Sequence, residues 1–480
     1  MKRVLARLPE ALAIAAVLAA YAFFGGGASF DFRRISWQDS YYASLSEGFF
    51  RGHLYMAHEP NPKLAAVSYP YDPKIREGID YLWDTSYFNG HYYLYFSPLP
   101  AVGFYMPYRL LRGGYPRDAL AATVFSAWAF MAAVMFLRRA LALRGKPLRI
   151  PLPLWILLAG FGNVVVFLLI DIRTYEVAIM CAMAMSATWA YALLRFAEAP
   201  SRGRALWVGV WLALALAARP NLGVLLFVTA YAIWRAERRS PRGWRGGVLA
   251  AVPLAITGVL LVAYNLARFG RPLEFGVTYQ LTFVPMAGRA VCSLCNLAEL
   301  SRFGDSMIHY LFWPLVIRSQ LPFTSIQFAN PDPATSFPMP GSEQIVGIFP
   351  LVPLTMLGAL FAALLALRRG AAYDAGTHTA LQLMAASWLI LIGLATCWWL
   401  VSRYSLDFMM LMAVATAVCI EEGLAFLAAA GIRVLPLRVL SIALACYTVI
   451  ISFLLGFAGP YDQFKDKHKA VYERITRALK

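Results

Sequence analysis

Charged residues are scarce in this chain of 480 residues, of which 14% are charged and 60% are apolar. Soluble globular domains carry about 25% charged residues, so this composition excludes an ordinary water-soluble fold. The sequence also lacks a Gly-rich phosphate-binding loop, a His-Glu-x-x-His motif and a Gly-x-Ser-x-Gly motif. Their absence argues against a nucleotide-fuelled mechanism and against the familiar zinc and serine hydrolase chemistries.

Cysteine is sparse as well, with six residues in the chain. Four of them lie in apolar runs, where we expect them to pack as small hydrophobic side chains: Cys181, Cys397, Cys419 and Cys446. Cys292 and Cys295 form the one close pair, in a segment expected outside the cytoplasm. Oxidising conditions there favour a disulfide between them, and a zinc site is the alternative, although partner ligands are not near.

Long apolar runs dominate the rest of the chain, which predicts an all-α polytopic membrane protein forming a single unit over residues 1–480. The first run, residues 8–24, is expected to be an uncleaved anchor rather than a signal peptide. Requiring about 20 apolar residues per span predicts eleven helices. They cover residues 8–24, 118–137, 150–170, 177–195, 205–218, 221–234, 248–267, 344–367, 380–400, 405–428 and 437–457.

The net charge of +17 comes mostly from Lys and Arg clusters at the ends of apolar runs. Such clusters mark the cytoplasmic side, so we expect a cytoplasmic N-terminus and no nucleic-acid partner. Two long segments, residues 25–97 and 268–343, are then left on the outer side as loops. Residues 458–480 should form an outer surface helix whose Tyr461, Phe464 and Tyr472 touch the membrane interface.

Three short segments on the outer side each carry a lone arginine. Arg173 lies in Asp-Ile-Arg-Thr-Tyr-Glu, Arg219 in Ala-Arg-Pro-Asn and Arg403 in Ser-Arg-Tyr-Ser-Leu-Asp. Positive charge is normally sparse on that side, so we expect these arginines to converge on a phosphate-bearing ligand. Contact with lipid headgroups, or an ion pair with a neighbour such as Asp407, is the simpler alternative.

The first outer loop predicts an amphipathic helix lying in the headgroup plane, because aromatic or apolar residues recur every fourth position from Trp37 to Phe49. Asp39 points away from that stripe, which is compatible with a catalytic carboxylate. Ser36-Trp-Gln-Asp39 also fits a capping box, in which Asp39 only closes the first helical turn.

Several short motifs, taken in order, resemble the GT-C glycosyltransferase superfamily and are similar to bacterial protein mannosyltransferase and aminoarabinose transferase-like enzymes. The motifs span most of the chain. They are Trp37-Gln38-Asp39-Ser40-Tyr41-Tyr42, Asp84-Thr85-Ser86-Tyr87, Gly90-His91-Tyr92-Tyr93, Arg173-Thr174-Tyr175-Glu176, Ala218-Arg219-Pro220-Asn221 and Arg403-Tyr404.

The resemblance implies an inverting enzyme that moves a sugar from a polyprenyl-phosphate carrier to a lipid, glycan or protein acceptor on the outer face of a bacterial inner membrane. It assigns the catalytic acid to Asp39, and Arg173, Arg219 and Arg403, singled out above from their positions, are the candidates for binding the lipid phosphate. Glu176 is a second acid, a metal ligand, a partner of Arg173 or a helix cap. The candidates for contact with the sugar or the acceptor are Tyr42, Asp84, His91, Tyr175, Asn221, Arg271 and Tyr404.

Two other functions fit the same sequence features: a transporter or flippase of a lipid-linked sugar, and a diphosphate-lipid-dependent polymer ligase or lipid-modifying transferase. Charges near mid-span would favour the transporter, whereas the charges here cluster at the ends of the apolar runs. The sequence leaves open whether a divalent metal takes part.

Overall fold

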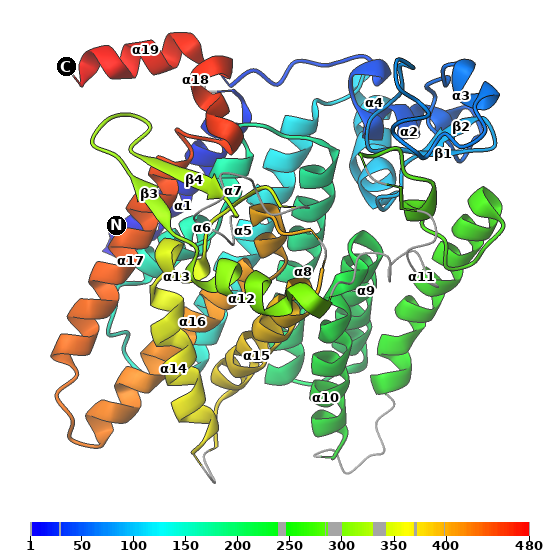
Figure 1. Cartoon of the computed structure of the whole chain (residues 1–480). Helices are drawn as coiled ribbons and strands as arrows, with labels where there is room; N and C mark the ends of the chain where they lie inside the picture. The colour runs from blue at the N-terminus through cyan, green and yellow to red at the C-terminus, as the bar shows by residue number, and fades with distance from the viewer. Residues whose placement is uncertain are drawn as a thin grey trace.

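The computed structural model describes residues 2–27, 30–238, 246–283, 285–286, 300–329, 342–368, 372–397 and 399–479. It is a bundle of helices with loop segments and the C-terminal helices gathered at one end (Figure 1). Seven of the described helices are long and apolar enough to cross a membrane. These are α1 (Lys2–Gly25), α5 (Asp118–Leu143), α8 (Thr174–Glu198), α11 (Gly246–Phe269), α15 (Ala375–Ala395), α16 (Leu406–Ala429) and α17 (Leu435–Leu455).

The remaining expected spans contain shorter helices. They are α6 (Leu152–Phe161), α7 (Val165–Leu168), α9 (Arg202–Ala218), α10 (Val224–Arg238), α13 (Ile348–Leu351) and α14 (Leu354–Ala366). Each of the eleven expected ranges therefore holds helix, and the apolar periodicity located them correctly. The number that cross a membrane stays a prediction, because four of the ranges hold helices below the length of a full span.

One expected helix, residues 150–170, is broken between α6 and α7 at Gly162 and Asn163. The side chain of Asn163 satisfies the freed backbone groups: its Oδ1 accepts from Val165 N at 2.9 Å, and its Nδ2 donates to Gly160 O at 3.2 Å. Tyr21 Oη of α1 also donates to Gly160 O at 2.6 Å. A broken helix inside an apolar bundle is tolerated because these groups re-satisfy its backbone.

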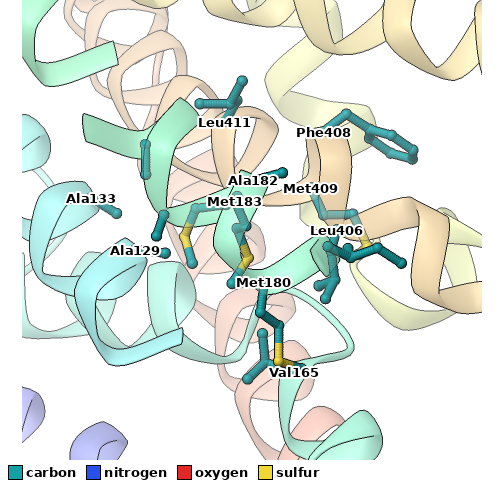
Figure 2. Packing of buried hydrophobic residues seen from close by; sticks show 14 of the residues in the cluster. Ala129, Ala133, Val165, Met180, Ala182, Met183, Leu406, Phe408, Met409 and Leu411 are labelled. Atoms are coloured by element: carbon teal, nitrogen blue, oxygen red, sulfur yellow. The ribbon is translucent and has the colours of Figure 1, made fainter. Parts of the chain in front are cut away.

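The centre of the bundle is packed by helices that are apolar on every side. Helix α8 is buried along most of its length, and α16 is buried from Leu406 to Leu424. Figure 2 shows Met180 and Met183 of α8 against Met409 of α16, with the small side chains Ala129 and Ala133 of α5 alongside. Small residues let helices approach closely, and flexible methionines fill the gaps that remain.

The loop segments carry short elements and two small antiparallel sheets, which the all-α prediction did not include. The first loop contains η1 (Trp37–Asp39), α2 (Tyr41–Phe50), α3 (Lys63–Ala66), β1 (Ser86–Phe88), β2 (His91–Tyr93), the π-helical η2 (Ala101–Tyr105) and α4 (Met106–Arg112). Of these elements, η2 and α4 follow directly after the first loop as it was predicted from the sequence. The second loop contains η4 (Val277–Tyr279), η6 (Leu300–Arg302), α12 (Phe303–Phe312), β3 (Leu315–Ile317) and β4 (Thr324–Phe328), and β5 (Gln344–Ile345) follows directly after it. The remaining short elements are η3 (Pro220–Gly223), η7 (Ser402–Ser405), η8 (Pro460–Asp462), α18 (Gln463–Lys467) and α19 (Lys469–Ala478).

The prediction of one interfacial helix from Trp37 to Phe49 is wrong in two respects. Ser40 has an extended backbone (φ −150°, ψ 138°), which separates η1 from α2 and breaks the four-residue stripe. Helix α2 is then buried on all sides from Tyr42 to Gly48, so it is not a surface helix. The chain after α2 folds back against this helix. Tyr55 lies so close to Gly48 that a Cβ on Gly48 would be 1.9 Å from Tyr55 O.

The two long loops are joined to one another. Asp84 N donates to Leu281 O at 3.0 Å, and Leu281 N donates to Thr85 O at 2.8 Å. The buried guanidinium of Arg76 also donates to Thr282 O. These bonds hold the two loops together at one end of the bundle, and they position the site described below.

A buried ionic cluster ties α5 to α16. Arg144 pairs with Glu422 through Nε at 3.2 Å, and its Nη1 lies 3.5 Å from Glu421 Oε2. The side chains of Arg144 and Glu421 are fully inaccessible to solvent. Ile150 N and Trp155 Nε1 also donate to Glu421 Oε1, at 2.8 and 3.2 Å. Removing one member of such a cluster leaves buried donors and charge without partners.

We therefore expect Glu421→Ala to destabilise the protein by about 3 kcal/mol or more, because Arg144 and the indole of Trp155 lose a buried acceptor. Glu77→Ala is the matched control, since Glu77 is exposed and its loss should cost at most about 0.5 kcal/mol. Thermal unfolding of the purified proteins in detergent measures both. Equal melting temperatures for the two variants would contradict a structural role for the cluster.

Candidate functional site: a cavity lined by four arginines

A cavity of about 480 Å³ opens where the loops meet the ends of the helices. Its walls come from the first loop, the start of α8, the α9–η3 junction, the end of α11, the second loop and η7. Segments that are far apart in the sequence therefore build one site. Four arginines line it, namely Arg173, Arg219, Arg268 and Arg403, together with the acidic residues Asp84 and Glu343.

The three arginines singled out from the sequence all reach this cavity, each from the end of a helix. Arg173 is the residue before α8, Arg219 ends α9, and Arg403 lies in η7. Arg219 is paired with Asp407 of α16: Nε and Nη2 lie 3.0 and 2.9 Å from Oδ2. Asn221 Nδ2 donates to the same oxygen at 2.6 Å, so the ion pair considered as an alternative is present.

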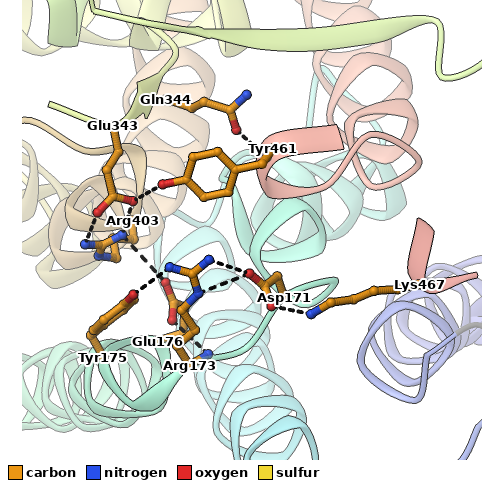
Figure 3. Close-up of polar contacts among 9 residues, drawn as sticks. All are labelled: Asp171, Arg173, Tyr175, Glu176, Glu343, Gln344, Arg403, Tyr461 and Lys467. Atoms are coloured by element: carbon orange, nitrogen blue, oxygen red, sulfur yellow. Dashed lines mark hydrogen bonds and ion pairs between the residues drawn. The ribbon is translucent and has the colours of Figure 1, made fainter. Parts of the chain in front are cut away.

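Arg403 is held by two carboxylates (Figure 3). It donates to Glu343 through both terminal nitrogens, at 2.6 and 2.7 Å, and its Nη1 lies 3.9 Å from Glu176 Oε1. The ring of Tyr175 lies under the guanidinium at 4.2 Å. Burial alone would raise the pKa of Glu343, but Arg403 and the hydroxyl of Tyr461 hold that pKa below its usual value.

Glu176 also caps α8, since Oε2 accepts from the backbone N of Arg173 at 3.0 Å. Of the roles considered for it, the helix cap is therefore present, whereas its ion pair is with Arg403 and not with Arg173. The Arg173 side chain pairs instead with Asp171, through Nε at 3.2 Å, and donates to Tyr175 Oη at 2.9 Å. Asp171 in turn pairs with Lys467 of α18 (Figure 3).

Arg268 differs from the other three because it has no carboxylate partner among the described residues. It is 5% exposed, and it donates to Leu94 O at 2.9 Å and to Asn265 Oδ1 at 2.8 Å. Its guanidinium lies 3.8 Å from the ring centre of Tyr264, and within the part of the chain that the structure describes its Nε has no acceptor. The carboxylate of Glu274 is bonded within its own loop. A nearly buried cation that lines a cavity and lacks a counter-charge favours binding of an anion.

Like Arg268, Asp84 is a charged residue of the cavity that has no ion-pair partner among the described residues. Its carboxylate accepts from Tyr95 Oη at 3.1 Å and from the amide of Gln280, with no ion pair among the described residues. Its backbone is left-handed (φ 60°) and is held by the bond from Asp84 N to Leu281 O. Burial raises the pKa of Asp84, and the bonds from Gln280 and Tyr95 and the charge of Arg403 oppose that shift. A carboxyl of this kind can accept or give up a proton.

Four candidates from the sequence lie outside the lining of the cavity. Asp39 is exposed, and its Oδ2 accepts from Ser36 N at 3.1 Å, so it forms the capping box considered as the alternative. Tyr42 is fully buried in α2, and Arg271 is exposed beyond the end of α11. His91 stacks on Tyr55 with ring centres 3.9 Å apart.

The other candidates are in or beside the cavity: Asp84, Arg173, Tyr175, Arg219, Asn221, Arg403 and Tyr404 line it, and Glu176 lines a small adjoining pocket. Cys292 and Cys295, with the disulfide expected between them, lie outside the described residues. Within the described ranges, no three His, Cys, Asp or Glu side chains come together as metal ligands would.

Sequence reasoning missed Tyr95, Arg268, Gln280 and Glu343 as site residues. A signal for Arg268 was present, because Asn265 and Arg268 are polar and one helical turn apart at the end of an otherwise apolar run. Gln280 and Glu343 carry no such signal, because they lie in loops whose path depends on contacts with distant segments.

Comparison of the chain with protein-family models and with curated proteins finds no match. The chemistry of the site therefore rests on the geometry of its own residues.

Binding of an anion in this cavity should depend on Arg268, because the other three arginines already form ion pairs. Their partners are the carboxylates of Asp407, Glu343 and Asp171. We expect Arg268→Gln to weaken the binding of inorganic pyrophosphate at least about tenfold, as loss of a charge-assisted hydrogen bond predicts. Arg271→Gln is the control, since it removes an equal charge from an exposed position outside the cavity. Calorimetric titration of the detergent-purified proteins gives both affinities, and equal values would refute the assignment.

Proposed function

We propose that this protein is an integral-membrane glycosyltransferase that moves a sugar from a polyprenyl-phosphate carrier to an acceptor hydroxyl. The observation that carries the proposal is that Asp84 and Arg268, which have no ion-pair partners among the described residues, line the same cavity. Transfer from a phosphate needs both groups, one to take a proton and one to stabilise the anion that leaves.

The motifs that resemble the GT-C superfamily support this proposal by their positions. Pieces centred on Asp84, Arg173, Arg219 and Arg403 are spread over more than 300 residues, and all four line the cavity. The pieces that carry Asp39 and His91 lie outside the lining, so the support comes from these four. The likeness in sequence and the arrangement in space therefore favour the same chemistry.

The proposed reaction uses the residues in defined roles. Asp84, in its ionised form, takes the proton of the acceptor hydroxyl as that oxygen forms a bond to the anomeric carbon. The bond between the anomeric carbon and the phosphate oxygen breaks, and the lipid phosphate leaves with an additional negative charge. Arg268 stabilises that charge by donating hydrogen bonds from its planar guanidinium, which keeps its own charge throughout.

This assignment moves the catalytic role from Asp39 to Asp84. Asp39 is exposed and engaged as a helix cap, whereas Asp84 lines the cavity and has a raised pKa. The paired arginines Arg219 and Arg403 then act mainly by holding the walls of the site and adding positive potential.

Aromatic side chains suit the remainder of the substrate. Trp83 and Phe283 line the cavity, remain 45% and 48% exposed, and stack with ring centres 5.9 Å apart. Such surfaces accommodate a sugar ring or an isoprenyl chain. Because the short segments that connect the helices at the other end carry clusters of Lys and Arg, we propose that the cavity opens on the outer face of a bacterial inner membrane.

Replacing Asp84 with Asn should abolish transfer, with a loss of at least about a thousandfold in rate, because the amide keeps the size of the side chain but cannot accept the proton. Asp39→Asn is the matched control, and we expect it to retain transfer, because an Asn can still cap the helix. The assay uses purified variants with a radiolabelled polyprenyl-phosphate sugar, and donor binding is measured beside it. The reverse pattern, with Asp39→Asn inactive and Asp84→Asn active, would refute the assignment.

The pH dependence of transfer gives a separate check. A base works only when ionised, so the rate should rise with pH through the pKa of Asp84, which burial raises from its ordinary value. Tyr95→Phe removes a donor that stabilises the carboxylate, so the rising limb should move to higher pH. Tyr69→Phe, outside the cavity, should leave the profile unchanged. A Tyr95→Phe profile equal to that of the wild type would count against Asp84 as the base.

A further inference from the structure

The last helix, α19, carries a surface that the proposed reaction does not use. Its sequence, Lys-Ala-Val-Tyr-Glu-Arg-Ile-Thr-Arg-Ala, has apolar side chains at positions that fall on one face of a helix. Together with α18 it carries five basic residues and two acidic ones: Lys465, Lys467, Lys469, Arg474 and Arg477, against Asp466 and Glu473. The segment is therefore both amphipathic and cationic.

Helix α19 runs across the direction of the long helices, at the end of the bundle that carries the loops (Figure 1). The chain holds it there at its start: Phe464 of α18 is fully buried, and Tyr472 Oη donates to Leu321 O at 3.0 Å. If the long helices cross a membrane, a helix in this orientation lies parallel to the membrane surface. The residues expected to touch the interface are corrected at the same time, because Phe464 is buried and Tyr461 is bonded to Glu343.

The apolar face of α19 is only partly covered by the rest of the protein. Val471, Tyr472 and Ile475 are half-buried, whereas Leu479 on the same face is 60% exposed. On an ideal helix these four residues span an arc of about 100°, and Arg474 and Lys469 stand about 60° beyond its two edges. Both cations are exposed. Basic side chains beside an apolar arc can reach phosphate headgroups while the arc enters the boundary of the acyl chains.

We propose that α19 docks on the anionic lipid headgroups of the leaflet next to the cavity. The charge of the segment selects an anionic surface over a zwitterionic one, because each Lys or Arg near such a surface contributes about 1 kcal/mol. We expect docking also to stabilise the wall of the cavity that contains Arg173. Lys467, two residues before α19, pairs with Asp171, and Asp171 pairs with the cavity residue Arg173.

Hydrogen exchange of the full-length protein in nanodiscs tests this docking directly. We expect backbone amides of residues 469–479 to exchange about tenfold more slowly in discs containing phosphatidylglycerol than in phosphatidylcholine discs. The double variant Lys469→Glu with Arg474→Glu should lose that difference. Lys63→Glu with Lys74→Glu is the matched control, because it makes the same change in charge at exposed positions of the first loop and should keep the difference.

Three results would overturn the proposal. One is equal exchange of α19 in the two kinds of disc, and another is a difference that survives reversal of both charges in α19. The third is protection that appears in native membranes but not in phosphatidylglycerol discs, which would assign the protection to another component of those membranes. None of these readouts requires transfer activity, so the docking can fail while the proposed function stands, and the reverse also holds.

Discussion

The ion pairs that surround the cavity are the constraint on which the site depends. A guanidinium withdrawn from water is costly unless it meets a carboxylate or several good acceptors. Arg403 meets Glu343 at the end of the second loop and Glu176 at the start of α8, so three distant segments are held at one point. Arg219 and Asp407 fasten the α9–η3 junction to α16 in the same way. These pairs fix how the helix ends are arranged, and with them the shape of the cavity.

Two charged groups of the cavity stand outside this pairing. Asp84 is bonded by neutral donors from both loops, and Arg268 is bonded by neutral acceptors near the end of α11. Arg268 is nearly buried and Asp84 is half-buried, and neither has an ion-pair partner among the described residues, which is typical of a site completed by its substrate. An acid and a cation in this condition, on the wall of one cavity, are complementary to a hydroxyl and a phosphate.

The far cluster of α5 and α16 shows the contrasting case. Arg144, Glu421 and Glu422 are also buried, but every charge there faces an opposite charge and Glu421 accepts further hydrogen bonds. The groups of this cluster satisfy one another, so it needs no ligand to complete it. Burial of charge alone therefore does not mark a functional site, and the difference lies in whether a partner is present.

The sequence by itself determined where the helices lie, because length and apolar character are properties of each segment alone, and every expected span contains helix. It also identified Arg173, Arg219 and Arg403, since a cation at the end of an apolar run stands out without reference to any other residue. Tertiary structure alone decided the roles. Asp39 and Asp84 are both loop carboxylates in the sequence, and only the pairing of Thr85 with Leu281 and the bond from Gln280 bring Asp84 into the cavity. Arg268 differs from the other three arginines because it has no carboxylate partner among the described residues. Which side chains surround a residue depends on contacts between distant segments, and no local sequence pattern encodes those contacts.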